Sequence, residues 1–259
     1  EEIAKEAKAA GLRGVLGQSV IQFPVADAKT PAEGLARAEK FIQAFRNDPL
    51  ITPAVAPHAI YTNDSATLKA AREMSMRYGV PTLIHVAETQ SEAMTARERG
   101  SPTVVSYLES LGFLGPGVVA AHAVWVDDSD IALLKSRGVG VSHNPESNMK
   151  LASGVAPVKS YLAQDVAIGL GTDGAASNND LDMFEAMREA SFLQKVSTAD
   201  PTAVSARAAV QMATIGGARV LGMQKQIGSL EAGKRADVIV VGMSASRQTP
   251  MYDPLSHLV

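Results

Sequence analysis

The chain has 259 residues, 46% of them hydrophobic, which is enough to bury one large core. Its 24 basic and 27 acidic residues give a net charge of −3 with no run of like charge, which argues against nucleic acid and anionic membranes as partners. Cysteine is absent, which excludes disulfides and thiolate metal sites, and no apolar stretch approaches the roughly 20 residues that span a bilayer. We therefore expect a cytoplasmic protein without a nucleic-acid or membrane partner, with self-association into a homo-oligomer left open.

Both ends of the chain interrupt a pattern. The chain opens without methionine inside the charged, helical run EEIAKEAKAAGL, which is unlike a signal peptide, and it ends at YDPLSHLV. We expect from these ends that the chain is truncated on both sides.

Between the ends, short apolar runs alternate with amphipathic helical stretches. The apolar runs predict strands at 12–17, 50–56, 80–86, 117–122, 138–143 and 166–171. Helical patterns follow at 31–46, 64–78, 90–99, 103–111, 128–137, 155–164 and 181–196. Continuous apolar strands separated by helices predict a parallel sheet that is covered on its faces.

The number and order of these units favour one architecture. Consecutive strand–helix units with no Gly-rich phosphate loop favour a (β/α) barrel over a doubly wound sheet. A closed TIM-type (β/α)8 barrel has eight units. The sequence therefore predicts an α/β barrel of this type whose first two strand units are absent.

The last part of the chain has a different pattern. After a helical stretch at 201–215, the run IGSLEAGKRADVIVVGM at 227–243 combines turn signals with alternation and predicts short strands. We divide the chain into an incomplete barrel at 1–222 and a second segment at 223–259.

Histidines recur where the predicted strands end. His58, His85, His122 and His143 lie at or just beyond four strands, and Asp173 ends the sixth. One histidine at a strand end is more often a core residue, but four with an aspartate favour a shared site, because barrel active sites lie at the carboxyl ends of the strands. Imidazole and carboxylate ligands suit zinc or iron. The sequence therefore predicts one divalent metal beside Asp173.

An acid accompanies this site. In LIHVAETQSE, Glu88 lies three residues beyond His85, past the end of the strand. A carboxylate beside a metal can take a proton from an activated water and pass it to a leaving group. Glu88 could instead be an acid in the first turn of the next helix, and the sequence leaves both roles open.

These residues lie in segments that resemble a known family. APHAIYT, LIHVAET, AAHAVWV, VSHNPESNMKLASGVAPV and GLGTDGAASNNDLDMFEAMR resemble the amidohydrolase superfamily. They are most similar to its 5-methylthioadenosine/S-adenosylhomocysteine deaminases, near the triazine chlorohydrolases and guanine deaminases. The resemblance implies a (β/α)8 barrel with a small β-sandwich, whose beginning would be the segment 223–259. It also implies hydrolytic deamination of an adenosine-type nucleoside to the inosine-type product.

The resemblance implies a role for each matching residue. His85 and Asp173 match metal ligands of the fifth and eighth barrel strands, and Asp173 would also accept a proton from the bound water. Glu88 matches the acid that protonates the purine ring, binds the substrate there and shuttles protons. His122 matches the catalytic histidine that holds the attacking hydroxide or the substrate. His58 matches a histidine that contacts the nucleoside.

Four further residues of the matching motifs are assigned roles other than metal binding or proton transfer. Ser177 lies in the substrate loop and would bind substrate, with helix capping as its alternative role. Asn144 and Asn148 are assigned to shaping the loop in SHNPESN, and His143 is assigned a structural role.

The sequence departs from the family in two places. The family's first strand carries a His-x-His pair of ligands that occurs nowhere here, which leaves His85 and Asp173 with His122 in reserve, so we expect the isolated chain to be inactive. Relatives that accept S-adenosylhomocysteine use arginines after the third strand, but QSVIQFPVADAKT has none, which favours 5'-methylthioadenosine or adenosine. A guanine deaminase, a triazine chlorohydrolase-like enzyme and an inactive barrel fragment remain the alternatives.

Overall fold

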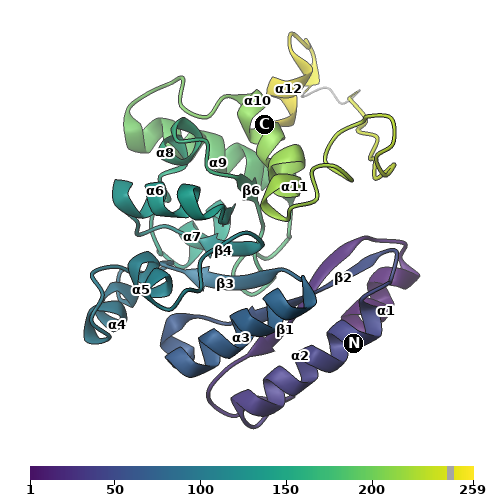
Figure 1. Cartoon of the computed structure of the whole chain (residues 1–259). Coiled ribbons are helices and arrows are strands. Elements are labelled where there is room, and N and C mark those ends of the chain that lie inside the picture. The colour runs from purple at the N-terminus through teal and green to yellow at the C-terminus, as the bar shows by residue number, and fades with distance from the viewer. Residues whose placement is uncertain (244–247) are drawn as a thin grey trace.

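The computed structural model describes residues 1–243 and 248–259. In this part of the chain, six parallel strands form one sheet whose order equals the chain order (Figure 1). The strands are β1 (Gly14–Val20), β2 (Ile51–Pro57), β3 (Thr82–Val86), β4 (Val118–His122), β5 (Gly140–His143) and β6 (Ile168–Leu170). All six were predicted, with ends that agree within three residues. Because β1 and β6 are not paired, the described residues do not close a barrel, which agrees with the predicted number of units.

The helices also follow the sequence pattern. Those predicted are α1 (Glu2–Ala9), α2 (Pro31–Phe45), α3 (Ser65–Tyr78), α4 (Glu92–Glu98), α5 (Val104–Ser110), α6 (Asp128–Arg137), α8 (Val158–Ala163) and α9 (Met183–Thr198). The helix predicted at 201–215 is α10 (Ala206–Gln211), which continues through a π-helical turn, Met212–Gly216, into α11 (Gly217–Val220). Two short helices were missed, α7 (Pro145–Lys150) and α12 (Pro254–Leu258), as was the 3-10 turn Ile60–Thr62. No helix of the described residues has the length and apolar character that a membrane crossing requires.

Side-chain caps define several helix starts. Asp64 accepts a hydrogen bond from the backbone N–H of Thr67 at the start of α3, and Asp127 accepts one from Asp130 at the start of α6. Each cap satisfies a donor that the first helical turn cannot satisfy itself.

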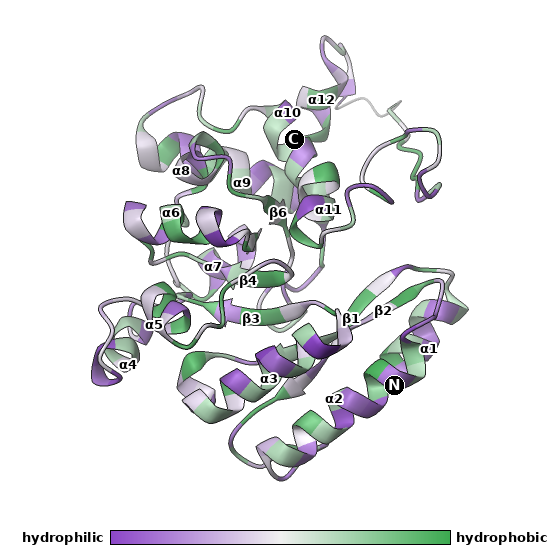
Figure 2. Ribbon diagram, viewed as in Figure 1, coloured by the Kyte–Doolittle hydropathy of each residue, from purple (hydrophilic) through white to green (hydrophobic). Residues whose placement is uncertain are grey.

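The hydrophobic core is divided along the sheet. The largest cluster packs between β3–β6 and their helices and includes Leu68 of α3, whereas two smaller clusters lie between β1, β2 and α1–α3. Strands β2 and β3 share the single register pair Val55↔Thr82, but β1 and β2 are in register over their full length. Figure 2 shows hydrophobic residues concentrated along the strands and mixed with polar residues on the helices. The join between β2 and β3 is therefore the shortest paired run within the sheet.

Glycines bring α11 close to the sheet. A Cβ at Gly169 would lie 2.7 Å from the Cα of Gly217, and one at Gly140 would lie 2.8 Å from the Cα of Val220. Only glycine permits so close an approach of two backbones. These contacts hold β6 in place, and with it the loop that follows β6.

The strands predicted within 227–243 are not present. Residues 236–243 are irregular, and Ile239 and Val240 are 78% and 97% exposed. An alternating sequence becomes a strand only where a neighbour accepts and donates its backbone hydrogen bonds, and no strand of the described chain lies beside it. The boundary at 222/223 remains a proposal, and residues 244–247 of the second segment lie outside the described residues.

Candidate active site

The structure brings five residues together at the carboxyl edge of the sheet. The ring centroids of His58 and His85 are 4.7 Å apart, and those of His85 and His122 are 5.4 Å apart. The Nε2 atom of His122 lies 3.8 Å from Oε2 of Glu88 and 3.9 Å from Oδ2 of Asp173. Residues from β2, β3, β4 and the loop after β6 therefore form one continuous cluster, as their positions at strand ends predicted.

The backbone turns sharply where these strands end. His122 and Asp173 have φ angles of 69° and 64°, and Ala87 and Ala123 have angles of 48° and 44°. This left-handed region is unusual for residues other than glycine and costs on the order of 1–3 kcal/mol for each residue. Backbone hydrogen bonds from Ala123 to Val86 and from Val124 to Ala87 hold the turn after β4 against the end of β3. The strained backbone thus redirects His122 and Asp173 into the cluster.

His85 has the environment of a metal-binding histidine. Its Nδ1 atom lies 2.8 Å from the carbonyl oxygen of His58, to which it can donate a proton. This contact leaves Nε2 as the ring nitrogen available to a ligand, an arrangement common among metal-bound histidines.

Asp173 accepts several hydrogen bonds. Its Oδ2 accepts from the hydroxyls of Ser147 and Ser177 at 2.7 and 2.8 Å, and its Oδ1 accepts from the N–H of Gly174 at 2.8 Å. Partial burial works to raise the pKa of Asp173, but these donors and His122 hold it below its ordinary value. An ionised carboxylate and a free imidazole nitrogen fit a divalent cation.

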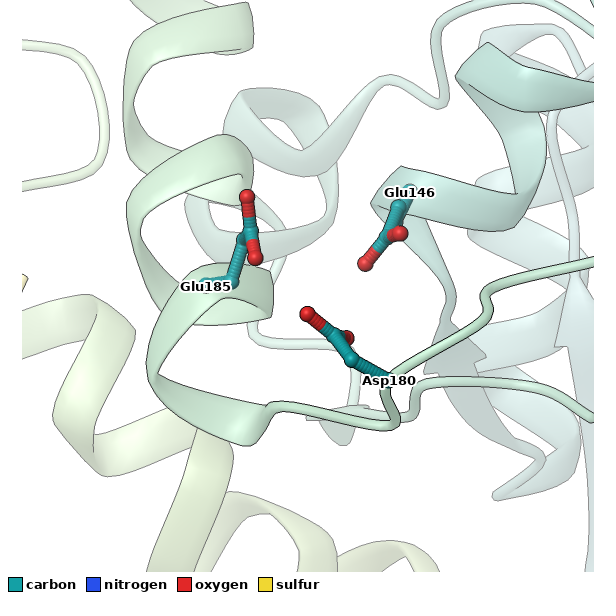
Figure 3. Close-up of side chains that lie close together, drawn as sticks. All are labelled: Glu146, Asp180 and Glu185. Carbon is teal, nitrogen blue, oxygen red and sulfur yellow. The ribbon is translucent and has the colours of Figure 1, made fainter. Parts of the chain in front are cut away.

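The ligand set is nevertheless incomplete. In residues 1–243 and 248–259, the one group of three potential ligands within 4.8 Å of one another is Glu146, Asp180 and Glu185, and it includes neither His85 nor Asp173. Figure 3 shows these three carboxylates converging from α7, from the loop before α9 and from α9 itself. They lie outside the site described here. His85 and Asp173 thus offer two donor types that fit a divalent metal, without a third ligand beside them among the described residues.

Glu88 faces the site rather than the next helix. Helix α4 begins only at Glu92, whose Oε1 accepts the backbone N–H groups of Glu88 and Thr89 at 2.8 and 3.2 Å. The carboxylate of Glu88 instead accepts a hydrogen bond of 3.1 Å from the hydroxyl of Ser153 and faces His122. The acid in the first turn of the next helix is therefore Glu92 and not Glu88.

The other two predicted substrate-contacting residues, His58 and Ser177, also lie at this edge. Burial lowers the pKa of the half-buried His58, and His85 lowers it further, so the His58 ring favours its neutral form. Its Nδ1 lies 3.0 Å from Oγ1 of Thr62. Ser177 does not cap a helix, because the side chain that caps α9 is that of Asp182.

Sequence reasoning missed the contacts of SHNPESNMKLAS. Its residues Ser147, Asn148 and Ser153 each hydrogen-bond a predicted site residue, although Asn148 was assigned only to loop shaping. The motif was visible, but the partner of each side chain is set by the fold. His143 is fully buried among the described residues, and burial lowers its pKa to about 3, so it is neutral.

Parallel strand–helix units that gather histidines and acids at the carboxyl edge of the sheet define a (β/α)-barrel enzyme site. The amidohydrolase family model matches residues 1–258, and the chain belongs to this family.

Similar proteins act on nucleosides. A 5-methylthioadenosine/S-adenosylhomocysteine deaminase from Thermodesulfovibrio yellowstonii is 44% identical over 259 residues, which are 100% of this chain and 59% of that protein. A 5'-deoxyadenosine deaminase from Methanosarcina acetivorans is 45% identical over 100% of this chain and 60% of that protein. The crystal structure of a zinc-bound adenosine deaminase from Xanthomonas campestris has a TM-score of 0.95 and 40% identity over 98% of this chain and 58% of that one. The chain thus spans less than two thirds of the length of each of these relatives.

Proposed function

We propose that the protein carrying this chain hydrolyses the exocyclic amine of an adenosine-type nucleoside, 5'-methylthioadenosine or S-adenosylhomocysteine, and releases ammonia and the inosine-type product. The observation that carries the proposal is the pair of carboxylates, Glu88 and Asp173, whose oxygens lie 3.8 and 3.9 Å from His122 Nε2. Hydrolytic deamination needs one group to protonate the ring and another to manage the protons of the attacking water. The names of the relatives support the adenosine class.

His85 and Asp173 would hold one divalent metal, since imidazole and carboxylate donors suit zinc or iron, and zinc is favoured because a solved neighbour contains zinc. When bound, such a metal supplies the Lewis acidity that lets water lose a proton near neutral pH. Further ligands have to come from outside the 259 residues or from His122. We therefore expect the isolated chain to bind metal weakly and to lack activity.

The chain's own residues divide the proton transfers. Glu88 donates a proton to the ring nitrogen next to the carbon that bears the amine, which makes that carbon electrophilic. Glu88 regains a proton from the hydroxyl added to that carbon when the carbonyl of the inosine-type product forms. His122 holds the attacking water in place through Nε2. Asp173 accepts a proton from that water and passes it to the departing ammonia. His58 and Ser177 contact the nucleoside from the strand end of β2 and from the loop after β6.

The tail of the substrate is inferred from the loop after β1. This loop contains no arginine, and the ammonium of its Lys29 donates to the carbonyl of Val25 at 3.1 Å. A buried substrate carboxylate without a cationic partner is costly. 5'-Methylthioadenosine should therefore have a higher kcat/KM than S-adenosylhomocysteine.

The test is ammonia release and loss of adenine absorbance by the metal-loaded, full-length protein. The substrates are 5'-methylthioadenosine, S-adenosylhomocysteine, 5'-deoxyadenosine, guanine and a chlorinated triazine. Turnover of the adenosine-type compounds supports the proposal, whereas turnover of guanine or triazine alone would show that the substrate class is wrong. A preference for S-adenosylhomocysteine would contradict the tail argument alone. Cytoplasmic location and homo-oligomer formation remain predictions, to be checked by cell fractionation and light scattering.

A further inference from the structure

One short segment contacts every group to which we assign a proton transfer. Ser147 donates to Oδ2 of Asp173 at 2.7 Å, and Oδ1 of Asn148 lies 2.8 Å from Nδ1 of His122. Ser153 donates to Oε1 of Glu88 at 3.1 Å. The three contacts come from α7 and the turn directly after it, while their partners come from three different strand ends.

The contact between Asn148 and His122 assigns the two ring nitrogens. Asn148 is 0% exposed and His122 is 1% exposed, so bulk water does not compete with the hydrogen bond between them. The amide oxygen of Asn148 accepts the proton on Nδ1 of His122. The other ring nitrogen, Nε2, therefore faces Glu88 and Asp173. A histidine oriented in this way has one nitrogen available to the reacting atoms.

The segment is itself held rigidly. The N–H of Asn148 donates to the carbonyl of Asn144, and the N–H of Ser153 donates to the carbonyl of Asn148 at 2.8 Å. The indole of Trp125, which follows β4, donates to the carbonyl of Ser153 at 2.6 Å. Any displacement of α7 would therefore move the hydrogen-bond partners of all three groups together.

We propose that Ser147, Asn148 and Ser153 are positioning residues that fix Asp173, His122 and Glu88 relative to one another through α7 and its following turn. This proposal rests on the proposed function for the identity of the reaction. Buried partners of ligands and proton donors typically change activity or metal affinity by about 10–100-fold when they are removed. They act through orientation, so substrate binding should change little.

Paired substitutions of similar shape separate hydrogen bonding from packing. Ser147→Thr keeps the hydroxyl, and Ser147→Val has nearly the same shape without it. Asn148→Asp keeps the acceptor oxygen, and Asn148→Leu lacks it. We expect the Val and Leu variants to lose about 10–100-fold in kcat relative to their Thr and Asp partners, with KM within about threefold. Equal kcat within each pair would overturn the proposal.

The control lies in the same segment. Asn144 is also buried, but its side chain bonds Ser142 rather than a site residue. Asn144→Ala should keep kcat, and an equal loss in this variant would assign the effect to general destabilisation of the segment and overturn the positioning role.

Two measurements do not depend on turnover. In protein with ¹⁵N-labelled histidine, the Nδ1 proton of His122 should be protected from solvent exchange and should lose that protection in Asn148→Leu. Metal titration should show weaker binding for Ser147→Val than for Ser147→Thr. No change in either measurement would contradict the proposal even if the enzyme deaminates adenosine. Absence of deaminase activity, with both changes present, would contradict only the proposed function.

Discussion

At the scale of single residues, the two carboxylates of the site have different surroundings. Asp173 accepts hydrogen bonds from Ser147, Ser177 and the backbone of Gly174, and these donors keep it ionised. Glu88 accepts one side-chain hydrogen bond, from Ser153. An acid with several donors is held in the fixed position that a metal ligand needs, whereas an acid with few partners is free to reorient toward a substrate.

This difference predicts how two isosteric substitutions fail. In the full-length protein, Asp173→Asn should lose metal and activity together, because an amide carries no charge and Ser147 and Ser177 would face its N–H₂ group. Glu88→Gln should keep its metal and lose about 10²–10⁴-fold in kcat, the usual contribution of a proton donor. Metal content by elemental analysis, measured beside kcat, tests both variants. Equal metal loss in both would show that the two roles are wrongly assigned.

At the scale of elements, the close contact of α11 with the sheet depends on glycine. A methyl group at Gly169 would overlap the backbone of Gly217 at 2.7 Å. Gly169→Ala should therefore reduce the free energy of unfolding by about 1–3 kcal/mol, as overpacked sites typically do. Urea unfolding measures the change. Gly14→Ala is the matched control, because a Cβ in that strand would meet its nearest atoms at an ordinary 3.4 Å. Equal losses in both variants would contradict the argument.

The acidic cluster between α7 and α9 predicts a pH dependence of stability. Burial and, to a smaller extent, the negative charges of Glu146, Glu185 and Asp180 together raise the pKa of Glu189 to about 7. Since the folded state binds this proton more tightly than the unfolded chain, the contribution of Glu189 to stability is present below about pH 4.5 and is lost as pH rises toward 7. Glu189→Gln should raise the melting temperature more at pH 8 than at pH 5.

The control for this prediction lies outside the cluster. Lys150 of α7 lowers the pKa of Glu146, whereas the neighbouring acids raise it. Because salt screens these charges, the comparison with wild type has to be made at constant ionic strength. Glu98→Gln, at an exposed position in α4, should shift the melting temperature equally at both pH values. A Glu189→Gln profile parallel to wild type would show that the cluster does not control this pH range.

The sequence predicted elements whose signal is local. The six strands were found because apolar, β-branched runs such as LITPAVA stand out between helices. Helix α7 was missed because six residues with a polar sequence carry no helical period, although Pro145 at its start was a signal. The strands expected in 227–243 were wrong because pairing depends on a distant partner. The contacts of Asn148 and Ser153 depend on strand ends that only the fold brings together.

At the scale of the whole molecule, the sheet has two parts that meet at a short join. Strands β1 and β2 pack with α1–α3 on two small clusters, and β3–β6 share the large core. The single register pair Val55↔Thr82 links the strands of the two parts, while Ile60 and Leu68, which follow β2, also pack into the large core. Their stabilities should therefore differ.

Hydrogen exchange measures this difference. At increasing denaturant, the amides of β1 and β2 should lose protection before those of β3 and β4, because β1 and β2 are stabilised mainly by two small clusters. Simultaneous loss of protection in all strands would indicate one cooperative unit instead.

The join between β2 and β3 has a further consequence for the route by which the chain folds. Glu88, His122 and Asp173, with the segment that holds them, lie on one continuous stretch from β3 to the loop after β6, and each strand there pairs with its nearest neighbour along the chain. Short loop closures of this kind are made early, so this stretch can condense before β1 and β2 dock. His58 reaches its position beside His85 only when β1 and β2 dock. During refolding, we expect protection of β3–β4 amides to precede quenching or enhancement of a probe placed near His58, and the opposite order would show that the first part nucleates folding.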